Sequence, residues 1–226
     1  MIYLGKYDEA KKILLEIESK QPNIYETSSN LGTLYELTGD NKNALIWIEK
    51  ALKLNTESHH GSEWIHVAIL KKKLGLISSE NILNLDFGNE ETPKTNLNKE
   101  QLQKLVNDLS YQLSERNQFV KPKESIVARL YFDLGNALAL NLDLESAIKA
   151  YNLSKQYGYK NPILDKRLVS FQEIIKDNPD SGKQIDIADK EEKTFLIIFS
   201  IISLIFVSLL FFTIRYIIRR RKINKN

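Results

Sequence analysis

One fixed spacing between matching small residues most constrains how this chain can fold. Gly5 and Gly39 have the same separation as Ala10 and Ala44. Ala147 stands at the corresponding place in a third, more distant copy. A period of about 34 residues is typical of stacked helix–turn–helix units, each of which buries its apolar face against the next unit. The spacing in this chain matches that period. We therefore expect an all-α fold: a short, irregular helical solenoid.

The clearest copy runs from Tyr25 to Ser58 and carries two predicted helices. Gly32 on the first helix and Ala44 on the second let the helix axes approach closely, while Tyr35 and Ile48 fill the space beside them. This arrangement resembles the tetratricopeptide repeat family, whose pattern is L-G-x2-Y on the first helix and A-x3-F on the second. The resemblance implies a protein that binds partner proteins or extended peptides and that is not an enzyme.

A second, later copy covers residues 128–159. Its Gly135 and Ala147 have the same separation as Gly32 and Ala44 of the first copy. Leu142 stands where a turn glycine is expected, so this turn must form without glycine. The amphipathic stretch at residues 162–176 predicts one more helix, which we interpret as the C-terminal cap of the solenoid.

The middle of the predicted 1–178 repeat domain is irregular. Trp64 begins a first helix, but its partner helix at residues 78–87 is degenerate and lacks the expected alanine. Residues 86–97 are polar and predict a loop. Residues 98–117 then predict a helix, because leucine and valine recur on one face.

The C-terminal part of the chain predicts a membrane anchor. Phe195–Ile214 is a continuous run without a charge. A helix that crosses the hydrocarbon core of a bilayer needs about 20 apolar residues, and this run provides that length. We expect a polar linker at residues 179–193, a single transmembrane helix at 194–218 and a basic tail at 219–226. The protein would then reach the membrane through Phe195–Ile214.

The distribution of charge around this run predicts its orientation. Six of the 32 Lys and Arg residues, and none of the 29 acids, follow Ile214. The positive-inside rule places this tail in the cytoplasm and the repeat body outside it. Since the unit around Gly5 lacks most of its first helix, we expect that the chain is an N-terminally shortened form whose missing part held an export signal. The alternative is a tail-anchored protein with a cytoplasmic body.

Candidate binding residues follow from the resemblance. In the tetratricopeptide repeat family, first-helix positions line a groove that receives extended peptides. The residues at these positions here are Glu26, Ser29, Asn30, Thr33, Glu36, Arg129, Asp133 and Asn136. Acidic Glu26 and Glu36 disfavour a clamp for a C-terminal carboxylate, and the alternative for each polar residue is a solvated face. We predict a protein-binding groove formed by Glu26, Asn30, Thr33, Arg129, Asp133 and Asn136.

The sequence offers little for catalysis. His59, Glu63 and His66 have a spacing that suits zinc if the helix continues through Gly61. Glycine is expected to break the helix there, which leaves Trp64 to pack between units and the histidines to cap or solvate the helix start. We therefore expect no metal site, no catalytic residue and no cofactor.

The resulting prediction is a membrane-anchored, non-enzymatic scaffold for protein–protein interaction. The slightly acidic body argues against nucleic acid as a partner, and no small-molecule substrate is evident. A sensory or signalling repeat protein that lacks its output domain is the second interpretation, and a metal-dependent enzyme is the third.

Overall fold

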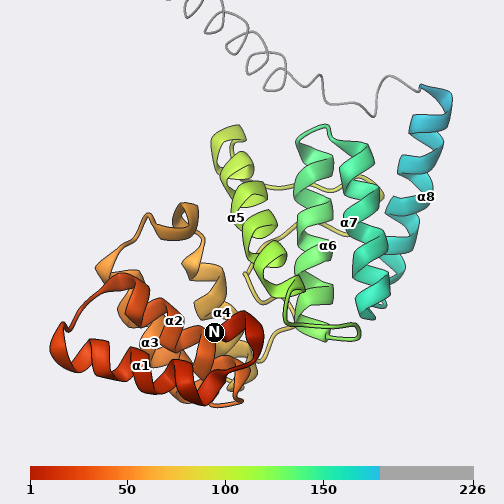
Figure 1. The fold of residues 1–226 in the computed structure, drawn as a ribbon. Coiled ribbons are helices and arrows are strands. Elements are labelled where there is room, and N and C mark those ends of the chain that lie inside the picture. The colour runs from red at the N-terminus through yellow and green to blue at the C-terminus, as the bar shows by residue number, and fades with distance from the viewer. Residues whose placement is uncertain (179–226) are drawn as a thin grey trace, which may run out of the picture. The chain divides into compact units, whose positions relative to one another are not determined.

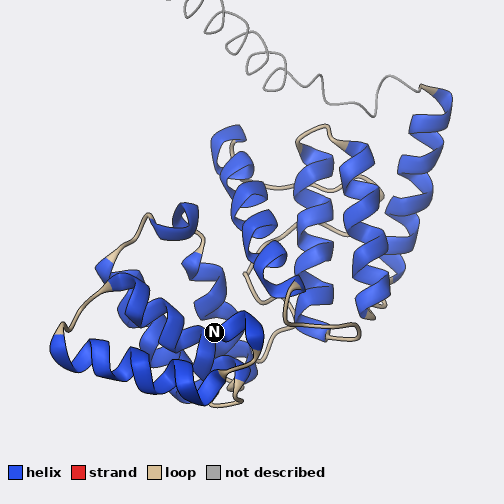
Figure 2. Cartoon of the chain, in the orientation of Figure 1, coloured by secondary structure: helices blue, strands red, loops and turns tan. Residues whose placement is uncertain are grey.

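The computed structural model describes residues 1–178, and every regular element in this range is helical (Figures 1 and 2). Two short 3₁₀ turns, η1 (Ile2–Leu4) and η2 (Ser58–Gly61), accompany the α-helices. These are α1 (Tyr7–Lys20), α2 (Tyr25–Leu37), α3 (Asn41–Leu54), α4 (Glu63–Lys73), α5 (Lys99–Asn117), α6 (Ser125–Leu140), α7 (Leu144–Tyr157) and α8 (Pro162–Asp177).

The predicted linker, membrane helix and basic tail at residues 179–226 lie outside the described residues. Within residues 1–178, none of the helices combines the length and the apolar character that a bilayer crossing requires.

Helices α2 and α3 form the repeat that the fixed spacing predicts. Ala44 and Ile48 on α3 are fully buried, and a Cβ atom added to Gly32 on α2 would collide with the side chain of Ile48. Gly39 has a φ of +86° in the turn between the helices, and Asp40 caps α3 by accepting a hydrogen bond from the backbone N–H of Asn43 at 3.1 Å. The predicted close approach of the two helices is therefore confirmed.

Helices α6 and α7 repeat this arrangement. A Cβ atom on Gly135 would collide with the ring of Tyr151, and Ala147 is fully buried. Leu142 adopts a φ of +64° in the turn, the left-handed conformation that glycine would occupy without strain. Asp143 then caps α7. The prediction that this turn forms without glycine is confirmed.

The segment between α4 and α5 differs from the expectation. Residues 78–87 form no helix, so the prediction of a degenerate partner helix is wrong. The side chain of Asn81 donates to the carbonyl of Leu85 at 2.7 Å and accepts from its N–H at 3.0 Å. These bonds offer the backbone an alternative to the helix. The segment instead places Ile82 and Phe87 in the core with α5 and α6.

Helices α5 and α8 lie where the sequence predicts them. Asn98 and Gln101 form a capping box at the start of α5. On α8, Leu164, Leu168 and Phe171 are buried together with Tyr151 of α7. Helix α8 thus covers the end of the α6–α7 pair, as its amphipathic pattern predicts.

Candidate functional site

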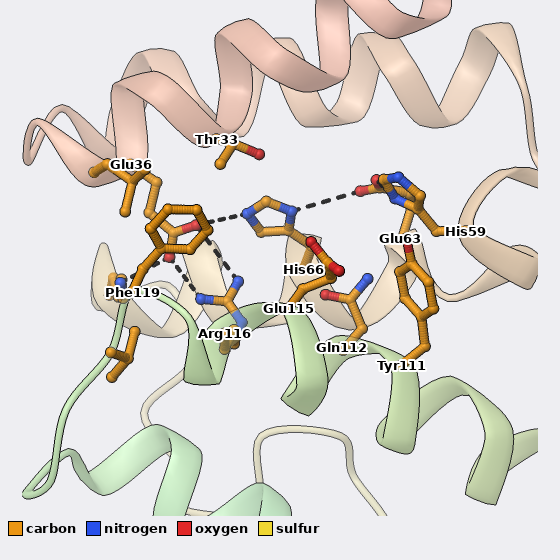
Figure 3. A pocket seen from close by; sticks show the side chains of 13 residues that line it. Thr33, Glu36, His59, Glu63, His66, Tyr111, Gln112, Glu115, Arg116 and Phe119 are labelled. Atoms are coloured by element: carbon orange, nitrogen blue, oxygen red, sulfur yellow. Dashed lines mark hydrogen bonds and ion pairs between the residues drawn. The ribbon is translucent and has the colours of Figure 1, made fainter. Parts of the chain in front are cut away.

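A pocket of about 230 Å³ opens between α2, α4 and α5 (Figure 3). Helix α2 contributes Thr33 and Glu36 to its lining. A smaller pocket of about 160 Å³ shares four lining residues with it and extends along α2. The shared residues are Thr33, His59, Glu115 and Phe119. The two pockets together form one groove, which we call the α2–α5 groove.

Glu36 is the centre of a charged network in the floor of this groove. Its carboxylate pairs with Arg116 of α5 at 2.9 Å, with His66 of α4 at 2.7 Å and with Lys73 of α4 at 2.7 Å (Figure 3). Burial alone would raise the pKa of Glu36, but Arg116, His66 and Lys73 outweigh burial and hold this pKa well below its ordinary value. The network therefore ties α2 to both α4 and α5.

His66 and His59 flank a second buried carboxylate, Glu63. His59 Nδ1 lies 2.5 Å from Glu63 Oε1, and His66 Nδ1 lies 3.6 Å from Glu63 Oε2. Burial acts to raise the pKa of Glu63, but the hydrogen bond with His59 and the proximity of His66 lower it to about 2. Burial would lower the pKa of His66, yet the pairing with Glu36 raises it. Both carboxylates are thus favoured in their ionised form, and their partners belong to the same chain.

The backbone around η2 explains how His59 reaches Glu63. His59 and His60 have φ values of 50° and 57°, and Gly61 has a φ of +74°, so the helix is interrupted here as predicted. The expectation that the histidines are solvated or cap the helix is wrong for His66, which is buried between two carboxylates. Trp64 packs toward α5 as expected, and its Nε1 donates to Asp108 at 2.7 Å.

The described residues contain no group of three or more His and acidic side chains arranged to hold a metal ion. In the α2–α5 groove, the carboxylates and imidazoles are already engaged with one another and with Arg116 and Lys73. Such a balanced network fixes helices at a defined distance, and this is the role its geometry supports.

The walls of the groove are aromatic and carry an acid. Tyr111 of α5 stacks on His59 with ring centres 5.1 Å apart, and Phe119 stacks on Tyr3 at 5.2 Å. Glu115 lines both pockets and accepts a hydrogen bond from the Tyr3 hydroxyl at 3.3 Å. The repeat pattern does not predict Tyr111, Glu115 and Phe119 as groove residues, because nothing in it brings α5 against α2.

The structure brings the three predicted binding residues of α2 together. Glu26, Asn30 and Thr33 all line the smaller pocket of the α2–α5 groove, and Thr33 lines the larger one as well. Glu26 and Asn30 are exposed, and the Asn30 side chain donates to the backbone carbonyl of Glu26 at 2.7 Å. Their role in binding stays a prediction.

The three predicted binding residues of α6 lie elsewhere and are mostly inaccessible. Asp133 and Asn136 are fully buried, so the expectation that they line an open groove is wrong. Asp133 pairs with Arg129 at 3.0 Å, and Asn136 accepts from both Tyr151 and Arg167. Burial raises the pKa of Asp133 to about 6 despite the nearby guanidinium of Arg129. These side chains are therefore committed to contacts inside the protein.

Comparison with known proteins agrees with this geometry. The profile of the tetratricopeptide repeat family matches residues 25–58, which are α2, α3 and the turn that follows. No curated protein matches the chain. The matched residues include the contact of Gly32 with Ile48 and most of one wall of the α2–α5 groove. Residues 25–58 are therefore similar to a tetratricopeptide repeat, in a described region whose regular elements are all helical, and repeats of this family generally bind partner proteins.

Proposed function

We propose that this protein is a non-enzymatic scaffold that holds a partner protein in the α2–α5 groove. The observation that carries the proposal is the position of this groove: it extends along α2 of the matched repeat and contains Glu26, Asn30 and Thr33. Its floor is fixed by the ion pairs of Glu36, so the walls are preorganised before a partner arrives. Preorganisation reduces the ordering cost of binding.

The side chains that face the opening indicate the chemistry of the partner. Tyr111 and Phe119 line the groove with rings that each stack on a neighbour by one face only, and the carboxylates of Glu26 and Glu115 line it as well. A guanidinium or ammonium group gains both from aromatic faces and from carboxylates. The proposed partner segment is therefore extended and carries Arg or Lys.

Anchoring in a membrane is the second part of the proposal. The uncharged run Phe195–Ile214 and the basic residues after it support a single transmembrane helix with a cytoplasmic tail and an extracytoplasmic repeat body. A scaffold confined to a membrane meets its partners at a raised effective concentration, so individually weak contacts suffice. The alternative topology is a tail-anchored protein whose body lies in the cytoplasm.

Two experiments separate these parts. For the groove, Glu26→Lys should reduce the amount of co-purified partner at least fivefold, whereas Lys53→Glu should not. Lys53 is the matched control because it is exposed on α3 and lines neither pocket of the α2–α5 groove. Equal partner recovery with both variants would refute the groove.

For the membrane, extraction with alkaline carbonate should leave the full chain in the pellet and release a variant truncated after residue 178. Protease added to intact cells should digest the body if it lies outside the cytoplasm. Release of the full chain by carbonate would refute the anchor, and survival of the body until the cells are opened would establish the tail-anchored topology.

A further inference from the structure

The inner side of α6 and α8 is already covered by another part of the chain. In Figure 1 the segment between α4 and α5 passes behind α6 and α7. Hydrogen bonds place its residues 86–94 against α8, and Phe87 belongs to the core formed with α5 and α6. The guanidinium of Arg167 donates both to the side chain of Asn136 and to the backbone of the segment, so Asn136 lies beneath this contact.

Arg167 holds the segment through its backbone. The side chain is fully buried, and it donates to the carbonyl oxygens of Phe87 at 2.8 Å, Gly88 at 2.9 Å and Glu90 at 2.9 Å. A fourth hydrogen bond goes to the side-chain oxygen of Asn136 at 2.5 Å. All four acceptors are uncharged, and three of them belong to the peptide backbone of the segment.

Residues 86–94 also have two features of a separate peptide ligand: a turn held by its own contacts and a buried aromatic side chain. Its turn is closed by its own contacts: the N–H of Lys94 donates to the carbonyl of Phe87 at 3.0 Å, and Lys94 pairs with Glu90 at 2.8 Å. Gly88 has a φ of +64°, which favours glycine at this position. Phe87 is the buried aromatic anchor, whereas Asn89 and Glu90 are exposed.

Arg167 occupies a binding position of the repeat. Arg167 follows Asp133 by one repeat period, which is the same number of residues that separates Ala44 from Ala10. Arg167 therefore has the position on α8 that Asp133 has on α6. Both positions correspond to a first-helix face. The guanidinium of Arg167 also lies 5.8 Å from the ring centre of Phe132, another first-helix residue of α6. The covered surface is thus the counterpart, in the second half of the body, of the open α2–α5 groove.

We propose that residues 86–94 are a built-in ligand that closes this second groove, and that a partner protein with an aromatic residue followed by glycine displaces it. The partner's aromatic side chain replaces Phe87, and its backbone carbonyls replace those that Arg167 now holds. The chain then has two grooves. The α2–α5 groove is open, and the second groove binds a partner only after that partner displaces residues 86–94.

The test supplies the segment as a separate molecule. In the full chain, residues 86–94 are replaced by a glycine–serine linker of equal length, and a fluorescent peptide with the sequence of residues 86–94 is titrated by anisotropy. The peptide should bind saturably to this variant and at least tenfold more weakly to the parent chain, whose groove is filled. A peptide with Phe87→Ala, or the linker variant with Arg167→Lys, should lose at least tenfold in affinity. Absence of saturable binding, or equal binding to parent and linker variant, overturns the proposal.

Two further measurements test whether the peptide binds at the second groove and whether residues 86–94 leave it. Glu26→Lys should leave binding of this peptide unchanged, so that failure of the α2–α5 groove and failure of this second groove are distinguishable. Hydrogen exchange of the unaltered chain tests displacement without any variant: the Lys94 amide, which donates to the carbonyl of Phe87 when the segment is in place, should exchange at least 100-fold faster than the amides in the middle of α6. Equal protection would mean that the segment leaves only on global unfolding, which overturns the proposal.

Discussion

Replacement of Gly32 by alanine tests the register of the repeat, because two physical effects oppose each other at this position. In the interior of an exposed helix, alanine in place of glycine stabilises by about 1 kcal/mol. Here the new Cβ atom would collide with Cγ1 and Cδ1 of Ile48 and would lie 3.2 Å from the Ile48 backbone nitrogen. Ile48 is fully buried and its backbone belongs to α3, so it has little freedom to retreat.

The expected result is a net loss of stability. Overpacking of this kind costs about 1–3 kcal/mol, which outweighs the gain in helix propensity. We expect the free energy of unfolding to fall by up to about 2 kcal/mol for Gly32→Ala, measured by urea denaturation of residues 1–178. Gly135→Ala should lose at least as much, because the rigid ring of Tyr151 occupies the corresponding space.

A double-mutant cycle provides the control. Ile48→Ala removes Cγ1 and Cδ1, the two side-chain atoms with which the new Cβ would collide, and leaves only the close approach to the backbone nitrogen. In that background Gly32→Ala should therefore stabilise, by up to about 1 kcal/mol. The sign of the Gly32→Ala effect should therefore reverse between the two backgrounds. If Gly32→Ala stabilises the protein with Ile48 intact, α2 and α3 do not approach at this glycine and the assigned register is incorrect.

Three other substitutions probe the polar interior and the turn. Glu36→Gln should destabilise by about 3–5 kcal/mol in thermal or urea unfolding, since it leaves the buried guanidinium of Arg116 without its carboxylate. Asp133→Asn should be as stable as the parent or more stable at pH 7, by up to about 3 kcal/mol. Burial raises the Asp133 pKa to about 6, above the ordinary 3.8, so the folded parent takes up this proton and gains stability as the pH falls from 6 toward 4. The advantage of the variant should therefore vanish near pH 4 in a urea titration series. Leu142→Gly should stabilise by about 0.5–1 kcal/mol, because Leu142 is exposed at a φ of +64°.

The helix pairs of this protein are predictable because their pattern is local. Gly32 and Ile48 have the same separation in the sequence as Gly135 and Tyr151, and in each pair the small residue and the large one specify the contact between neighbouring helices. The same holds for α5, where the capping box at Asn98 and one apolar face suffice.

The groove floor and the covered groove were not predictable, because they depend on residues far apart in the chain. Glu36 meets Arg116 from 80 positions away, and no periodicity links them. Asp133 and Asn136 have the spacing of exposed first-helix residues, yet they are fully buried in a half of the body where Arg167 binds a loop from far upstream. The sequence predicts a loop at residues 86–97, but not in the segment just before them: that segment departs from the helical pattern because the side chain of Asn81 bonds to the backbone of Leu85.

Site-specific photo-crosslinking in cells shows whether partners bind along the α2–α5 groove. A photoreactive residue is placed at Asn30 or Glu115, which line the groove, and in parallel at Lys12 or Lys53, which are exposed and line neither of its pockets. We expect a discrete crosslinked partner from Asn30 and Glu115 that is absent from Lys12 and Lys53 and disappears when Glu26→Lys is added. Crosslinks to the same partner from Lys12 and Lys53, and none from the groove positions, would contradict this expectation.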